Sequence, residues 1–133
     1  SPAEQLGTTN PTSRAARVNA ANSWGADYFI SLHCNASTNT EASGSEVYVY
    51  SETSPAFPLG EAILVGLQNA TGLRNRGMRI NPSLYVLRRT QMPALLVEMG
   101  YLTNVNDAQL LSTDPQAFAR GIYNGMLSYF QLD

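Results

Sequence analysis

The sequence predicts an α/β fold: one mixed, mostly parallel central sheet with helices on both faces, in a three-layer αβα arrangement. Short apolar runs typical of strands alternate with longer segments that show helical spacing and capping residues. The 133 residues fit one hydrophobic core, so 1–133 is treated as a single domain. A short loop joins the apolar runs at 28–34 and 45–51, which indicates that part of the sheet is antiparallel.

Four segments are predicted to be helices because they combine a capping residue or proline near the start with apolar residues at helical spacing. They are "NPTSRAARVNAANSWGA" (10–26), "SPAFPLGEAILVGLQNATG" (54–72), "NVNDAQLLS" (104–112) and a last helix that begins at Asp114 and Pro115. The last helix is expected to turn one stripe toward the core, formed by Phe118, Ile122, Met126 and Tyr129.

Strands are expected at 28–34, 45–51, 84–88 and 94–100, where β-branched, aromatic and aliphatic residues gather. The polar segment 1–9 and the Arg- and Gly-rich segment 73–83 have no clear periodicity. Both are therefore predicted to be loops.

Composition excludes several classes of protein. Hydrophobic residues make up 44% and charged residues 14%, which is typical of a globular chain, and the net charge of −2 argues against binding to nucleic acid or to an anionic membrane. No apolar run is long enough to span a membrane. Cys34 is the only cysteine, so no internal disulfide forms. The chain begins at Ser1 rather than Met, which favours a processed or truncated piece.

Two predicted strands end on a titratable residue. His33, the only histidine, closes "SLHCN", and Glu98 closes "LLVEMG". Ligands of open α/β sheets bind at the carboxyl ends of strands, so parallel strands would bring both side chains into one crevice. Ser31 and Asn35 share a face with His33, whereas Cys34 points to the opposite face and is expected to be a small buried residue.

Simpler interpretations remain open for each residue. His33 is also consistent with a core histidine bonded to a carbonyl, and Glu98 with the buried partner of Arg88 or Arg89 on the preceding predicted strand. Glu46 is expected to be solvated or at an edge rather than catalytic.

Three arginines, Arg74, Arg76 and Arg79, lie in the segment 73–83. They are expected to form a solvated loop. The alternative is that they hold a substrate carboxylate by bidentate pairing.

Taken together, several motifs resemble the zinc-dependent N-acetylmuramoyl-L-alanine amidases, which are bacterial cell-wall hydrolases (autolysins). The resemblance extends over nearly all of 13–130 and is specific in the order and separation of "SLHCN" and "PALLVEMGYLTN". The other segments that carry it are "ARVNAANSWGADYF", "GSEVYVY", "NRGMR" and "FARGIYNGMLSYF". It implies a hydrolase that cuts the amide between the muramoyl lactyl group and L-alanine of peptidoglycan.

The resemblance also implies roles for particular residues. His33 corresponds to one of two histidines that hold Zn²⁺ together with a glutamate, and Glu98 corresponds to the catalytic acid/base. Such a metal lowers the pKa of water and polarises the amide carbonyl. Asn35, Arg88 and Arg89 are assigned to substrate binding, and the location implied is extracellular, in the bacterial cell wall.

The sequence departs from the family in one large respect. The strand with the first histidine ligand and the helix with the glutamate ligand have no counterpart in 1–133, so the chain resembles the C-terminal three-quarters of the domain. A complementary N-terminal segment is therefore an expected partner. The alternatives are a catalytically inactive module that binds the wall or another partner, and a metal-free hydrolase that uses a His33–Glu98 pair.

Overall fold

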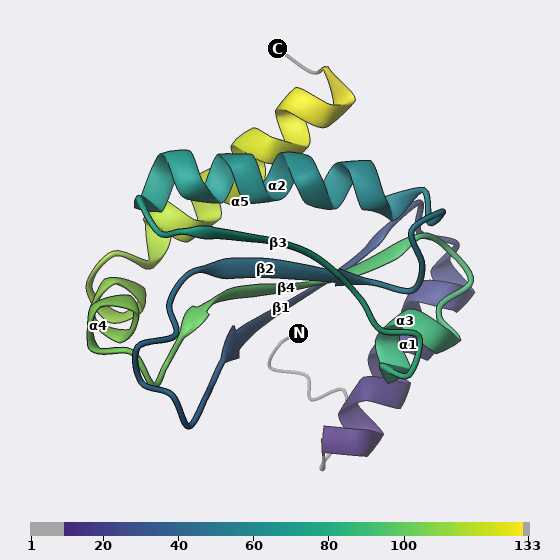
Figure 1. Cartoon of the computed structure of the whole chain (residues 1–133). Helices are drawn as coiled ribbons and strands as arrows, with labels where there is room; N and C mark the ends of the chain where they lie inside the picture. Colours follow the sequence, from purple (N-terminus) through teal and green to yellow (C-terminus); the bar gives the residue numbers. More distant parts are fainter. Residues whose placement is uncertain (1–9, 132–133) are drawn as a thin grey trace.

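One mixed sheet organises the chain, and helices cover both of its faces (Figure 1). The computed structural model describes residues 10–131, so the loop expected at 1–9 lies outside the described residues. The elements in chain order are α1 (Asn10–Trp24), β1 (Phe29–Asn35), β2 (Ser45–Val49), α2 (Ala56–Thr71), β3 (Asn75–Ile80), α3 (Tyr85–Arg89), β4 (Ala94–Tyr101), α4 (Val105–Thr113) and α5 (Pro115–Phe130).

The strand order of the sheet is β1-β4-β2-β3, with β1 parallel to β4 and β2 parallel to β3. The expected antiparallel part is present between β2 and β4. Because β4 lies between β1 and β2, these two consecutive strands are not neighbours even though a short loop joins them. The α/β class and the mixed, mostly parallel sheet are confirmed.

Two sequence predictions about the middle of the chain were wrong. The segment 73–83, expected to be a loop, contains β3, and the segment 84–88, expected to be a strand, overlaps the helix α3 at all but its first residue. Strand β3 lies at the edge of the sheet and is only partly buried, so its polar residues do not conflict with strand structure. Gly77 adopts a φ of +88° where the register between β2 and β3 shifts.

The short apolar run that forms α3 was ambiguous in sequence because four or five apolar residues fit a strand or one helical turn equally well. In the structure, Val86 and Leu87 of this helix are buried against Val18 of α1 and against Ala94 and Leu96 of β4. Tertiary packing, rather than local periodicity, therefore decides that this segment is helical.

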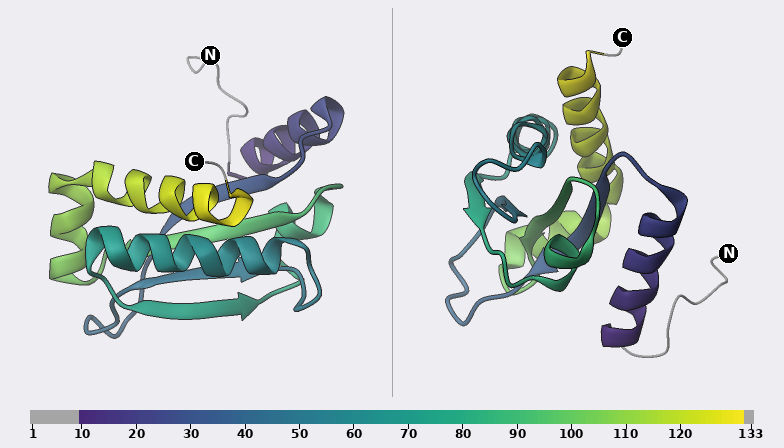
Figure 2. Two further views of the ribbon diagram at one scale, coloured as in Figure 1. Left: turned by 90° about the horizontal axis from the view of Figure 1, so that it is seen from above. Right: turned by 90° about the vertical axis from the view of Figure 1, so that its right-hand side faces the viewer.

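The two faces of the sheet carry separate hydrophobic clusters. Figure 2 shows α2 and α5 over one face and α1 on the other. Val47, Val49, Leu95 and Val97 face α2 and α5, and the stripe predicted for α5 packs there too. Alternate residues of β4 face α1 and α3 instead. Helices α1 and α3 cover only the start of β4, so the opposite end of that face is left for polar side chains.

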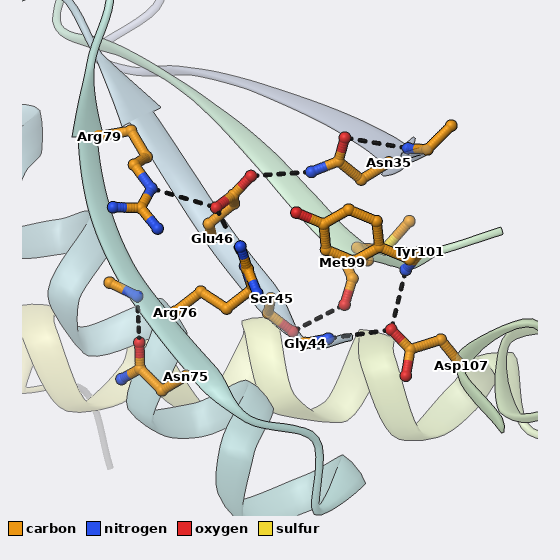
Figure 3. A network of polar contacts seen from close by, with 12 residues as sticks. Asn35, Gly44, Ser45, Glu46, Asn75, Arg76, Arg79, Met99, Tyr101 and Asp107 are labelled. Atoms are coloured by element: carbon orange, nitrogen blue, oxygen red, sulfur yellow. Dashed lines mark hydrogen bonds and ion pairs between the residues drawn. The ribbon is translucent and has the colours of Figure 1, made fainter. Parts of the chain in front are cut away.

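A fully buried aspartate, Asp107 of α4, ties together the ends of three segments (Figure 3). Its Oδ2 accepts hydrogen bonds from the backbone N–H of Gly44 and of Tyr101, both at 2.9 Å, and its Oδ1 accepts from Ser43 Oγ at 2.6 Å. A buried carboxylate is tolerated when donors saturate it in this way. Asp107 thus fixes the start of β2 against the end of β4.

We expect Asp107→Ala to lower the free energy of unfolding by about 3 kcal/mol, because two buried backbone N–H groups lose their acceptor and each such loss costs about 1–3 kcal/mol. Urea unfolding monitored by circular dichroism measures the change. Asp114→Ala is the matched control, because Asp114 is half-exposed, makes no capping bond and lies 4.0 Å from Arg120. An Asp107→Ala protein as stable as this control would contradict the proposed clamp.

Candidate functional site

His33 and Glu98 lie side by side at the same register of the parallel strands β1 and β4. Residues paired in this way project to the same face of a sheet, and both side chains line one cavity of about 520 Å³. The side of the cavity opposite the sheet is formed by residues of α1, α3 and the turn before α3. These residues are Arg14, Ser83, Leu84, Tyr85, Val86 and Arg88. The structure therefore brings the two predicted residues together.

The His33 imidazole is oriented by its neighbour on the same strand. Ser31 Oγ lies 2.8 Å from His33 Nε2, and Ser31 is itself buried. Burial lowers the pKa of His33, and the positive charges of Arg17 and Arg14 on α1 lower it further. The neutral imidazole therefore dominates at pH 7, which is the form that binds a metal.

One oxygen of the Glu98 carboxylate, Oε1, is buried and has no hydrogen-bond partner among the described residues. Burial raises the pKa of Glu98, and the negative charge of Glu46 raises it further. A raised pKa makes the carboxylate a stronger base, which suits it to proton transfer.

The structure does not show the ion pair with Arg88 or Arg89 that offered a simpler interpretation of Glu98. Arg88 lines the same cavity, but no ion pair joins it to Glu98 within residues 10–131. The Arg89 guanidinium instead lies 5.9 Å from the centre of the Tyr85 ring. Because the segment is a helix, consecutive side chains point about 100° apart, which separates the two arginines. Their assignment to substrate binding stays a prediction.

We expect Glu98→Gln to make the fold more stable at neutral pH. The folded protein holds the pKa of Glu98 above its ordinary value of 4.5, so the folded state favours the protonated form and loses stability as pH rises through that interval. Glutamine removes this penalty. Urea unfolding between about pH 4 and pH 8 should show a stability advantage of the variant that grows with pH, and an advantage that shrinks with pH would contradict the sign.

Glu46 was expected to be solvated or at an edge, and this prediction was wrong. It is 4% exposed and lies opposite Glu98 in the antiparallel pairing of β2 with β4. Its Oε1 accepts from Asn35 Nδ2 at 2.8 Å, and its Oε2 accepts from the Nε of Arg79 at 3.1 Å and of Arg76 at 3.4 Å (Figure 3). Arg76 and Arg79, expected in a solvated loop, are thus part of a bonded network, which was hidden from sequence because strand β3 was not predicted. Arg74, the third arginine of that segment, is exposed as expected.

Two further predicted residues are placed as follows. Asn35 donates to Glu46 and accepts from the N–H of Ala36, so its amide is held within the protein, and its role toward substrate stays a prediction. Cys34 does point to the opposite face, toward an apolar groove, but it is exposed rather than buried. The reason is that β1 lies at the edge of the described sheet.

The profile of the family described as N-acetylmuramoyl-L-alanine amidase matches residues 6–128. The chain belongs to this amidase family. It is 41% identical over 119 residues to the N-acetylmuramoyl-L-alanine amidase CwlM of Bacillus licheniformis, covering 87% of this chain and 46% of that protein. It is 39% identical over 119 residues to the sporulation-specific N-acetylmuramoyl-L-alanine amidase of Bacillus subtilis, covering 87% of this chain and 45% of that protein.

Solved amidase structures share the fold. The N-acetylmuramoyl-L-alanine amidase of Clostridium difficile 630 superposes with a TM-score of 0.81 at 30% identity and covers 91% of this chain and 67% of its own. The catalytic domain of CwlV from Bacillus (Paenibacillus) polymyxa gives a TM-score of 0.76 at 32% identity, with 90% of this chain and 66% of its own covered. The chain spans less than half the length of the curated relatives and about two thirds of these solved amidase chains.

The donors described in this amidase chain meet part of what a zinc site requires. His33 offers a neutral imidazole beside a carboxylate with a free oxygen. Structural and catalytic zinc sites use three or four protein ligands, however, and residues 10–131 contain no cluster of three or more His, Cys, Asp or Glu side chains that could hold a metal ion. By themselves, the described residues do not form a complete zinc site.

Proposed function

We propose that this chain forms the larger part of the catalytic domain of a peptidoglycan amidase that cleaves the amide between the lactyl group of N-acetylmuramic acid and L-alanine. The observation that carries the proposal is the pairing of His33 and Glu98 in one cavity, with a buried Glu98 oxygen that has no partner within the described chain. A catalytically inactive module would have no need of a buried, unpaired carboxylate, which costs stability. Membership of the amidase family supports the same activity.

Glu98 carries the proton transfers in this proposal. Its carboxylate accepts a proton from the water that attacks the lactyl carbonyl, and it then donates that proton to the nitrogen of L-alanine as the C–N bond breaks. Burial and the charge of Glu46 raise its pKa, which makes the carboxylate a stronger base toward the attacking water. In the metal-free alternative, the hydroxyl that contacts His33 is that of Ser31, and it is only 4% exposed, which closes it to substrate.

We further propose that His33 is one ligand of a Zn²⁺ ion, whose other ligands come from a segment outside the described residues. The depressed pKa of His33 and its contact with Ser31 favour a neutral, oriented imidazole. When bound, zinc would supply a Lewis acid next to the scissile carbonyl.

The same complementary segment has a place to pack. Strand β1 pairs only with β4 among the described strands, so its other edge presents unpaired backbone groups. On the face away from His33, an apolar groove of about 480 Å³ runs beside β1 and contains the exposed side chains of Leu32 and Leu102. We propose that an N-terminal strand and helix of the same domain cover this edge and groove.

The proposed location is the bacterial cell wall, outside the membrane, where the substrate lies. Two relatives are named as probable cell wall amidases of staphylococci, at 32% identity over 106 residues. In the described part of the chain, no helix has the length and apolarity needed to cross a membrane.

The proposed activity is tested by incubating purified peptidoglycan with zinc, the protein and its complementary N-terminal segment. An amidase releases peptides that begin with a free L-alanine amino group and creates no new reducing sugar ends. Sedimentation of the protein with insoluble peptidoglycan, with no release of such peptides, would instead support the wall-binding module.

A further inference from the structure

A line of charged side chains crosses the sheet from the proposed catalytic pair to the edge strand β3. His33, Glu98 and Glu46 occupy matching positions on β1, β4 and β2. The two arginines that bind Glu46 complete the line from β3 (Figure 3). Neighbouring strands lie about 4.8 Å apart, so the line extends roughly 10 Å from Glu98 on β4 to β3.

The ion-paired group of Arg76, Arg79 and Glu46 contains more positive than negative charge. Arg76 and Arg79 contribute two positive charges, and Glu46 contributes one negative charge. Both arginines reach the same oxygen of Glu46 through Nε, while Asn35 donates to the other oxygen. Glu46 is therefore saturated, and a single arginine would be enough to neutralise it.

The terminal Nη nitrogens of Arg76 and Arg79 are available to bind a ligand, because both arginines bond Glu46 through Nε. Within residues 10–131, neither guanidinium uses its Nη atoms in a side-chain hydrogen bond or ion pair. The Arg79 side chain is 44% exposed, and the Arg76 guanidinium lies over the Tyr101 ring with its Cζ 5.2 Å from the ring centre. The bonds from Nε to Glu46 orient both guanidinium groups, and the contact with Tyr101 further orients that of Arg76. The two terminal nitrogens of a guanidinium match the two oxygens of a carboxylate in bidentate geometry.

We propose that Arg76 and Arg79, held by Glu46, form a carboxylate-binding subsite on the peptide side of the scissile amide. The inference rests on the proposed amidase function and assigns the chemical class of the group recognised there. Both guanidinium groups reach back to Glu46, whose strand lies about 4.8 Å from that of Glu98, and two extended residues span roughly 7 Å. The carboxylate that fits is therefore on the second residue after the cut, next to L-alanine. A carboxamide at that position keeps the shape but loses the charge.

Two substrates that differ only in this group test the subsite: N-acetylmuramoyl-L-alanyl-D-glutamate and the corresponding D-isoglutamine amide. The zinc-loaded active protein should cleave the acid with a kcat/KM about tenfold to a hundredfold higher than the amide, as expected for a charge-assisted hydrogen bond. In Arg79→Gln, the ratio of kcat/KM for the acid to kcat/KM for the amide should be close to one. Arg120→Gln, which alters a largely exposed arginine on α5, should leave the ratio unchanged.

Equal cleavage of the two substrates by the unaltered protein would overturn the proposal, as would an unchanged ratio in Arg79→Gln. Loss of the ratio in Arg88→Gln alone would place carboxylate recognition in the cavity beside Glu98 instead. Circular dichroism of each variant shows whether it is folded.

Failure of the proposed function is distinguished by a second measurement that requires no catalysis. The dipeptide L-alanyl-D-glutamate is titrated by calorimetry into the protein and into Arg79→Gln. Tighter binding by the unaltered protein, weakening as salt is added, supports the subsite even if neither substrate is cleaved. Equal affinities would overturn it.

Discussion

Glu98→Gln is expected to lower the rate of amide hydrolysis by the zinc-loaded protein, complemented by its N-terminal segment, by about 10²–10⁴-fold while leaving the zinc content unchanged. Glutamine preserves the size and shape of the side chain in its cavity but cannot accept a proton from the attacking water. The free Oε1 of Glu98 makes no bond within residues 10–131 that the substitution would break, so the fold should persist. Release of muramoyl-linked peptide and metal analysis of the same preparation measure the two quantities.

Glu61→Gln is the matched control for this experiment, because Glu61 is an exposed glutamate on α2, on the other face of the sheet. It should retain full activity. If Glu98→Gln also retained nearly full activity, the strand-end carboxylate would be structural. If it lost zinc together with activity, Glu98 would be a metal ligand instead of the proton acceptor.

The 133-residue chain alone is expected to bind zinc weakly, and the addition of a complementary N-terminal segment is expected to produce tight, stoichiometric binding. The physical reason is the ligand count: His33 is the only histidine in the sequence, whereas zinc sites use three or four protein ligands. Metal analysis after extensive dialysis, with and without the segment, measures the difference. Tight stoichiometric zinc on the chain alone would show that ligands have been missed.

His33→Ala tests the proposed role of His33 as a zinc ligand. In the complemented protein, it should lower zinc content and activity together, because it removes the imidazole that the structure holds neutral beside Ser31. Glu61→Gln should keep both. Retention of zinc by His33→Ala, combined with loss of zinc by Glu98→Gln, would reverse the two assigned roles.

Sequence reasoning located the proposed catalytic pair because strands have a strict two-residue period. Once 28–34 and 94–100 were recognised as strands, the face and the end occupied by His33 and Glu98 followed, and the parallel pairing of β1 with β4 places them at one register. The network around Glu46 was missed for the opposite reason. Strand β3 is an arginine-rich edge strand, and its partly exposed residues show none of the apolar alternation that marks a half-buried strand.

The sequence by itself determined the α/β class, the long helices and the two strands that carry His33 and Glu98, because burial imposes a periodicity that can be read locally. Only the tertiary structure decided three other features: that 84–88 is a helix packed on α1, that β4 separates β1 from β2, and that Glu46 is saturated by Asn35 and two arginines. Each depends on contacts between segments far apart in the chain, and such contacts leave no local periodicity in the sequence.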